Sequence, residues 1–316
     1  MMAEPQERLQ LVFFGMMGMF SYHPLEALLE AGYQVRAIVT PRLQNWSVNV
    51  VSPAVLGRLR EAKNRRPLPQ LVPPALQNIR QLAYHMAIPL LEVESLQDAG
   101  SRDLPALDAY EPDAICVACF PYRLPDRLLR IPRLGSVNVH PSLLPDNRGP
   151  DPLFWNFRRG DAFTGVTVHV MDSGFDTGPI LLQERMQIPD GISEPALEEQ
   201  LAIQGGALLV RSLAGLSTQS IVPIRQDSQQ ATSFSFPVSD DFVITPERPA
   251  RWAYNFACGL RSRPVPILIQ IEGQRFRLLE AVDFDPDGIL ESRWRLDGDL
   301  LSVACRPGVF RARIAL

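Results

Sequence analysis

An amide and an imidazole lie at a spacing in this chain that suits chemistry on a carbonyl group. Asn138 and His140 alternate with Val137 and Val139, which predicts a strand that ends near residue 140. Side chains two apart on a strand point to the same face, so both polar groups can address one bound carbonyl. The proline-bounded run 141–145 then ends the strand.

A carboxylate completes this set of groups. Residues 165–171 predict a further strand, which runs into the turn 172–178 that contains Asp172 and Asp176. That turn can return Asp176 to His140, where its charge would raise the imidazole pKa and help to relay a proton. We expect Asp176 in this role, with Asp172 as the competing carboxylate.

These groups suit attack by an amine on a formyl carbonyl. The attack produces a tetrahedral oxyanion that needs donors already in place, and losing one such donor costs a factor of ~10²–10³ in rate. The amide N–H of Asn138 and a protonated His140 are the expected donors. The alternative is that Asn138 and His140 merely cap a strand end, which leaves the type and spacing of Asp176 unexplained.

The constellation resembles the formyltransferase family that uses 10-formyltetrahydrofolate. That family includes methionyl-tRNA formyltransferase, glycinamide ribonucleotide transformylase and the sugar-amine N-formyltransferases. The order of elements is most similar to methionyl-tRNA formyltransferase, although the Gly-Thr-Pro turn typical of that enzyme is absent and Gly15-Met-Met-Gly18 follows the first strand. The matching residues are Asn138, His140, 141–145, Arg148-Gly149, Gly165-Val-Thr167 and Asp176-Thr-Gly-Pro-Ile180.

The resemblance implies that 10-formyltetrahydrofolate is the co-substrate and that two loops hold it. The loop 172–176 would border the pterin mainly through backbone groups, and the segment 120–125 would form the second wall. Arg123 is unusual in that segment and could meet the glutamate tail of the folate or simply reach solvent. The expected folate contacts are Phe120, Tyr122, Arg123, Leu124, Pro125, Ser142, Leu143, Leu144, Pro145 and Asp172.

Two other groups of reactive side chains are expected to be structural. Cys116 and Cys119 form a C-x-x-C in an apolar strand without a second ligand pair nearby, so we expect small buried residues rather than a metal or redox site. His23, His85 and His169 stand alone on their elements, where histidine is usually structural. We therefore expect no metal.

Short apolar strands separated by helices in the first part of the chain predict an α/β fold with a doubly wound, mostly parallel sheet. Ligands of such sheets bind at the carboxyl ends of strands, where Asn138 and His140 fall. We assign residues 1–215 to this catalytic domain. Its expected strands are 9–14, 34–39, 114–117 and 137–140, and its expected helices are 24–31, opened by Pro24, and 194–215.

The last third of the chain predicts a separate small domain. Residues 216–239 are rich in serine and glutamine and read as a linker. Residues 240–316 are expected to form a small antiparallel, β-barrel-like domain after a helix at 251–261. Its expected strands are 267–271, 276–279, 300–305 and 309–314.

Charge is concentrated in the proline-rich segment 41–75. It holds Arg42, Arg58, Arg60, Lys63, Arg65 and Arg66 against Glu61, a net of +5, which leaves −9 for the rest of a chain whose total is −4. This excess favours contact with a phosphorylated partner, and in methionyl-tRNA formyltransferase the loop at this place approaches the tRNA acceptor stem. The alternative is a solvated surface helix at 56–64. The C-terminal domain has no basic excess.

Composition excludes several other classes of protein. No apolar run reaches the ~18 residues that span a bilayer, and the polar N-terminus is unlike a signal peptide. The four cysteines show no disulfide framework, which indicates a reducing cytoplasm. Gly15 and Gly18 lack the third glycine and the later acidic residue of a dinucleotide site.

The acceptor of the formyl group stays open at the level of sequence. Methionyl-tRNA leads, and a nucleotide-linked amino sugar suits the same motif residues. Hydrolysis of the formylfolate is a further alternative, because water can replace the amine. A non-catalytic folate-binding protein is the alternative from a different class, and the intact set of Asn138, His140 and Asp176 argues against it.

Overall fold

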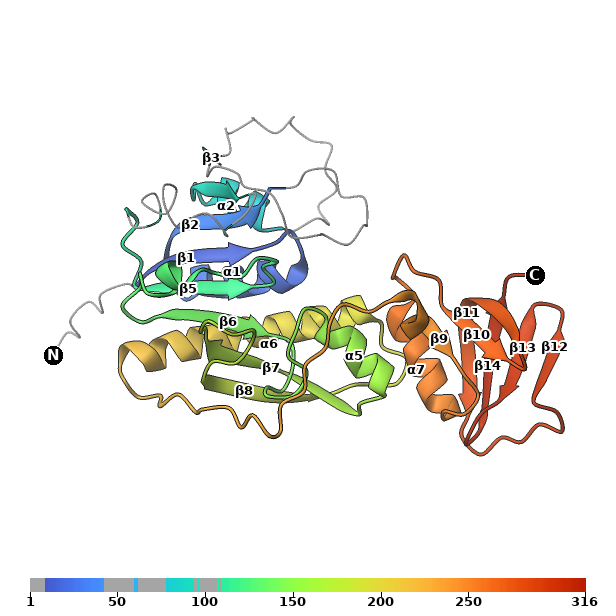
Figure 1. Ribbon diagram of the computed structural model, residues 1–316. Coiled ribbons are helices and arrows are strands. Elements are labelled where there is room, and N and C mark those ends of the chain that lie inside the picture. The colour runs from blue at the N-terminus through green and yellow to red at the C-terminus, as the bar shows by residue number, and fades with distance from the viewer. Residues whose placement is uncertain (1–8, 43–59, 62–77, 94–95, 97–106, 108) are drawn as a thin grey trace. The chain divides into compact units, whose positions relative to one another are not determined.

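The computed structural model of this protein describes residues 9–42, 60–61, 78–93, 96, 107 and 109–316 (Figure 1). Its chain divides into two compact units, each made of more than one segment. The predicted boundaries near residues 215 and 240 stay a prediction. The first unit takes residues 1–148, 165–184 and 199–232, and the second takes residues 149–164, 185–198 and 233–316.

The main sheet contains the strand that carries Asn138 and His140. Among the described residues its order is β3 (Arg60–Glu61), β4 (Leu90–Val93), β2 (Gln34–Pro41), β1 (Gln10–Gly15), β5 (Ala114–Ala118), β6 (Ser136–His140), β7 (Phe163–Val170) and β8 (Ile180–Gln187). The pairs β1–β2, β1–β5, β2–β4 and β5–β6 are parallel, while β3–β4 and β6–β7 are antiparallel. The predicted α/β fold with a mostly parallel sheet is confirmed.

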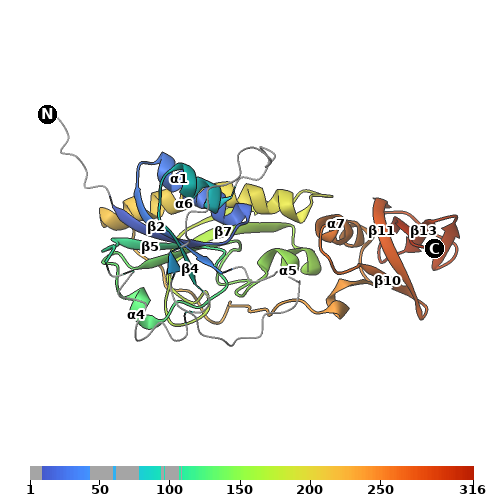
Figure 2. The same cartoon turned by 90° about the horizontal axis from the view of Figure 1, so that it is seen from above.

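Helices cover both faces of this sheet, as alternating side chains of buried strands require. Figure 2 shows α1 (Met19–Glu30) and α6 (Glu194–Ser217) on one face and α4 (Asp126–Leu129) on the other. The α4 face packs Leu124 and Leu128 against Val12 and Phe14. On the α6 face, a Cβ at Gly205 would lie 2.7 Å from the Val139 side chain, so glycine permits the close approach of α6 to β6. The described residues also form α2 (Ile79–His85), α5 (Pro152–Arg159) and α7 (Ala250–Leu260).

The prediction that Pro24 opens the first helix is wrong. The helix begins at Met19, and Pro24 lies inside it. The reason is tertiary: the Ser21 hydroxyl donates to the Ala118 carbonyl and accepts from the Met16 N–H, which anchors the first turn to the sheet. Burial of Phe20 adds to this anchor and outweighs the backbone hydrogen bond that a proline cannot donate.

The surface helix considered for residues 56–64 is wrong at Arg60 and Glu61. These two residues form β3, which pairs antiparallel with β4. The rest of that range lies outside the described residues, as do Arg58, Lys63, Arg65 and Arg66 of the basic segment.

The second unit contains a mostly antiparallel sheet, as predicted for residues 240–316. Its order among the described residues is β12 (Trp294–Asp297), β13 (Leu300–Ala304), β14 (Val309–Ile314), β11 (Gln274–Asp285), β10 (Leu268–Ile271) and β9 (Val243–Ile244). Only β9 and β10 pair in parallel among these described strands. In the described part of the chain, no helix has the length and apolar character needed to cross a bilayer.

A buried ion cluster joins three segments of the second unit. Arg263 donates to both carboxylate oxygens of Asp151 at 2.8 Å, and its Nε donates to Glu194 at 2.6 Å. Burial raises the pKa of Glu194, and the hydrogen bonds from Arg263 oppose that rise. The guanidinium therefore bonds two largely buried carboxyl groups from different segments.

The Arg263→Ala variant should lose about 3–5 kcal/mol of unfolding free energy, because it leaves two buried carboxylates without their partner. Burial raises the pKa of Glu194 in the folded state, so this carboxyl binds a proton more readily when folded, and the loss should shrink as the pH falls toward that raised pKa. Urea denaturation at several pH values measures both effects. The control is Arg251→Ala, whose exposed pair with Asp190 should contribute only ~0–1 kcal/mol. Equal losses in the two variants would contradict this account.

Candidate active site

Strand β6 positions the predicted amide and imidazole at its carboxyl end. Val137 and Val139 are buried between neighbouring elements, and His140 is 4% exposed. The register of β6 against β7 places His169 opposite Asn138 and Thr167 opposite His140. Two polar pairs thus lie side by side across the two strands.

The turn after β7 returns a carboxylate to these pairs. Asp176 Oδ1 lies 3.6 Å from His140 Nδ1 and 3.7 Å from His169 Nε2. These are ion-pair distances rather than hydrogen-bond distances. The three predicted catalytic residues therefore come together in the structure, and the carboxylate that faces the imidazoles is Asp176.

His169 is a member of this cluster that sequence reasoning missed. It was expected to be structural, yet its Nε2 lies 3.2 Å from the Asn138 amide nitrogen and its side chain is nearly fully buried. The signal was present in the sequence, because Thr167 and His169 alternate on the strand that leads into the Asp176 turn. Only the antiparallel register of β6 and β7 converts that alternation into contact.

The partners of the two imidazoles fix their tautomers. A carbonyl can only accept, so His140 Nε2 carries the proton that it donates to the Asn147 carbonyl at 3.0 Å. By the same argument His169 donates from Nδ1 to the Val170 carbonyl at 3.0 Å. His140 Nδ1 then faces Asp176 with a lone pair, and His169 Nε2 accepts from Asn138. The Asn138 amide keeps a second N–H that can donate to an oxyanion.

The expectation that Asp176 raises the His140 pKa above its ordinary value is wrong for the free protein. Burial lowers the pKa of His140 below about 6.5, and the nearby His169 lowers it further. The Asp176 charge and the Asn147 carbonyl raise it, but less than burial lowers it. His140 is therefore mostly neutral at pH ~7, a state in which Nδ1 can accept a proton.

The loop after β6 is held by bonds within itself and to Thr167. The Thr167 hydroxyl donates to the Ser142 carbonyl at 2.6 Å and accepts from the Leu144 N–H at 3.2 Å. Ser142 and Leu144 are buried, while Leu143 and Pro145 are partly exposed. Of the four loop residues expected to contact folate, Ser142 and Leu144 have little exposed surface. The same loop leads to Asn147, whose carbonyl accepts from His140 Nε2.

Asp172 stabilises the turn 172–178 through hydrogen bonds within the turn. Asp172 Oδ1 accepts from the Gly174 N–H at 2.9 Å and from the Thr177 hydroxyl at 2.6 Å. Gly178 is required sterically, because a Cβ there would lie 1.8 Å from the Val170 carbonyl oxygen. Asp176 itself adopts a left-handed φ of 55°, a strained backbone conformation that is common at functional sites.

The second expected folate wall lies against the core of the sheet. Phe120 packs edge-on against Phe14 and Tyr122, with ring centroids 5.1 and 5.6 Å away. Leu124 is buried in the core beneath them, and Pro125 precedes α4 as its N-cap. The rings therefore present partly exposed apolar surface at the carboxyl end of β5.

Arg123 links the two expected walls. Its guanidinium donates to the Ser173 carbonyl and lies 5.9 Å from the centre of the Phe175 ring, which is largely exposed. The side chain thus joins the segment 120–125 to the turn 172–178, and a contact with the glutamate tail of the folate stays a prediction. Both loops are thereby brought to the same edge of the sheet.

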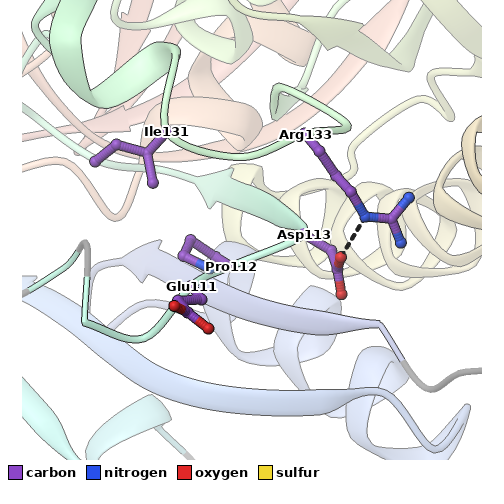
Figure 3. A pocket seen from close by; sticks show the side chains of 5 residues that line it. All are labelled: Glu111, Pro112, Asp113, Ile131 and Arg133. Carbon is purple, nitrogen blue, oxygen red and sulfur yellow. Dashed lines mark hydrogen bonds and ion pairs between the residues drawn. The ribbon is translucent and has the colours of Figure 1, made fainter.

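A separate pocket of about 450 Å³ lies at the end of the sheet opposite to the cluster (Figure 3). Its lining residues directly precede β5 and β6, so they sit at the amino ends of the parallel strands whose carboxyl ends carry the cluster. Asp113 and Arg133 form an ion pair of 2.6 Å across it. The lining residues are Glu111, Pro112, Asp113, Ile131 and Arg133. This pocket is distinct from the catalytic cluster.

The lowered pKa of His140 is directly measurable. Titration of its ring signals by NMR should give a value below about 6.5, and Asp176→Asn should lower it further because the carboxylate charge opposes burial. Asp172→Asn is the matched control, since that carboxylate bonds Gly174 and Thr177 instead. A His140 pKa that rises in Asp176→Asn would contradict the geometry.

Comparison with known proteins places this arrangement in one family. Residues 44–213 match the formyl transferase family. Methionyl-tRNA formyltransferase from Acidobacterium capsulatum is 32% identical over 256 residues, which cover 81% of this chain and 75% of that protein. Methionyl-tRNA formyltransferase from Anaeromyxobacter dehalogenans is 37% identical over 194 residues, 61% of each chain.

A solved structure shares the fold across nearly the whole chain. The N-formyltransferase from Helicobacter canadensis, crystallised with folinic acid and dTDP-3-aminofucose, superposes with a TM-score of 0.62 at 14% identity. That match covers 97% of this chain and 99% of the other. The family match and the relatives show that this chain belongs to the formyl transferase family of enzymes.

Proposed function

We propose that this protein transfers the formyl group of 10-formyltetrahydrofolate to the amino group of methionyl-tRNA. The observation that carries the transfer chemistry is the Asp176 carboxylate facing two imidazoles beside the Asn138 amide. Membership of the formyl transferase family supports a folate donor. The acceptor is supported by relatives that are named methionyl-tRNA formyltransferases and match much of the chain.

In the proposed reaction the acceptor amine attacks the formyl carbon and forms a C–N bond. The oxyanion accepts from the second N–H of Asn138. The proton lost by the amine passes to His140 Nδ1, directly or through water, and Asp176 at 3.6 Å stabilises the imidazolium. The oxyanion then collapses, the bond to the folate nitrogen breaks, and that nitrogen takes a proton from His140. One proton thus passes from the amine through His140 to the folate nitrogen, and His140 ends the reaction neutral.

The residues at the two loops suit a flat heterocycle. Phe120 and Tyr122 offer partly exposed rings, and the turn 172–176 offers backbone groups, so one wall is apolar and the other can hydrogen-bond. Arg123 holds the two loops together through Ser173. We propose the pterin between these walls, with Phe120, Tyr122, Leu143, Pro145 and the turn as its contacts.

The basic segment 41–75 is the proposed contact with the acceptor stem of tRNA. Its net charge of +5 on an acidic chain suits a partner with many phosphates. A nucleotide-linked amino sugar is the competing acceptor and would need fewer cationic contacts. A methionyl-tRNA acceptor would also locate the enzyme in the cytoplasm, as its cysteine usage predicts.

Removal of either reacting group should lower the rate of transfer without unfolding the protein. Asn138→Ala should reduce kcat by ~10²–10³, because one oxyanion donor is lost. His140→Ala should reduce kcat by ~10²–10⁴, because the proton acceptor is lost. Steady-state kinetics with 10-formyltetrahydrofolate and methionyl-tRNA, together with circular dichroism, checks both. A folded variant of either kind with wild-type kcat would show that the site is misassigned.

The two carboxylates of the turn should separate in kinetics. Asp176→Asn should lower kcat sharply, because the imidazolium formed during transfer loses its counter-charge. Asp172→Asn should mainly raise the KM for the folate, because it loosens the turn through Gly174 and Thr177. A larger loss of kcat in Asp172→Asn would reverse the assignment of the two roles.

The acceptor is tested through salt dependence. Replacing Arg58, Arg60, Arg65 and Arg66 together by serine should raise the KM for methionyl-tRNA and flatten its dependence on salt, because phosphate contacts act through counterion release. The KM for the folate should not change. An unchanged KM for tRNA across ~50–200 mM salt would remove the support from this segment and favour the amino-sugar acceptor.

A further inference from the structure

Residues 224–232 contact both loops of the active site, although they fall in the stretch 216–239 that reads as a linker. Ile224 pairs with Ile180 through two backbone hydrogen bonds of 2.8 Å. Further along, Gln226 and Thr232 reach the turn 172–178 and the loop 141–148. All of these residues belong to the first unit. We call residues 224–232 the return segment.

Gln226 holds the backbone of the turn that carries Asp176. Its Nε2 donates to the carbonyl of Asp176 at 2.8 Å and to the carbonyl of Gly178 at 2.7 Å. Its Oε1 accepts from Arg148 Nη2 at 2.7 Å and Nε at 3.1 Å. One amide thus ties the strained Asp176 to the loop that follows His140, which also gives the Arg148 of the matching motif a structural role.

Thr232 holds the carbonyl that sets the tautomer of His140. Its hydroxyl accepts from the Asn147 N–H at 2.8 Å and donates to the Asp146 carboxylate. Its own carbonyl accepts from the Arg148 N–H at 3.0 Å. Asn147 has a left-handed φ of 63°. Thr232 bonds the peptides on both sides of it, and the peptide with the Arg148 N–H carries the carbonyl that accepts from His140 Nε2.

We propose that Gln226 and Thr232 are positioning residues of the active site. Gln226 fixes where the Asp176 carboxylate lies, and Thr232 keeps His140 in the Nε2–H tautomer, with its lone pair toward Asp176. Neither side chain needs to touch a substrate. The kinetic part of this inference rests on the proposed formyl transfer, whereas its tautomer part concerns the free protein alone.

The Gln226→Met variant tests the first role, because methionine keeps the length of the side chain and loses its hydrogen bonds. We expect kcat to fall on the order of 10²-fold, since a displacement of ~1 Å at a reacting group costs that much, while both KM values stay within a few-fold. Gln229→Ala is the matched control, as only the backbone N–H of Gln229 bonds within the segment among the described contacts. Unchanged kcat in folded Gln226→Met would overturn this role.

The Thr232→Val variant tests the second role, because valine has the shape of threonine without its hydroxyl. Nitrogen-15 NMR of the free wild-type protein should show His140 protonated at Nε2. Thr232→Val should add the Nδ1–H tautomer and lower kcat, whereas Thr232→Ser should restore both to wild type. Thr232 is exposed, so the variant removes little buried surface.

The two proposals fail in different ways. A wild-type His140 protonated at Nδ1, or a Thr232→Val protein with unchanged nitrogen shifts, overturns the positioning role whatever the acceptor proves to be. If Thr232→Val does not fold, the wild-type spectrum still tests the tautomer, and Gln226→Met still tests the positioning of Asp176. Absence of formyl transfer by the wild type to methionyl-tRNA and to amino sugars would instead overturn the proposed function and leave the tautomer result standing.

Discussion

The hydrogen bond from His140 Nε2–H to the Asn147 carbonyl is the interaction on which the rest of the site depends. Since the carbonyl can only accept, it leaves a lone pair on Nδ1, and that lone pair faces Asp176. The same bond requires the loop 141–148 to turn back on itself, which Thr167 and the return segment enforce. One backbone carbonyl thus sets the orientation of the imidazole relative to the Asp176 carboxylate.

Burial and charge compete at His140, and burial wins in the free protein. A neutral imidazole suits the first half of a transfer, in which a proton must be accepted. In the proposed reaction, the carboxylate at 3.6 Å would matter most in the second half, when an imidazolium has a proton to return. In the proposed transfer, burial therefore leaves the imidazole unprotonated at rest, and the Asp176 charge supports it once it is charged.

The apolar pattern predicted most of the sheet because its strands are buried on both faces. Strands of this kind are short continuous runs of residues such as valine, isoleucine and phenylalanine, which are visible in the sequence. Helix boundaries depended on more distant contacts. The first helix begins before Pro24 because Ser21 bonds Ala118 on a strand nearly a hundred residues away. Arg60 and Glu61 likewise form a strand because they pair with β4, which lies about thirty residues later in the chain.

The sequence by itself determined the chemistry-bearing groups: Asn138 and His140 share a face because strand periodicity is local, and Asp176 follows in a turn that can reach them. Tertiary structure decided three further points. Register across β6 and β7 brought His169 to Asn138, and burial set the protonation of His140. The return segment read as a linker because Gln226 and Thr232 bond to backbone groups rather than pack in a core. Such bonds leave no apolar periodicity, so only the folded chain reveals them.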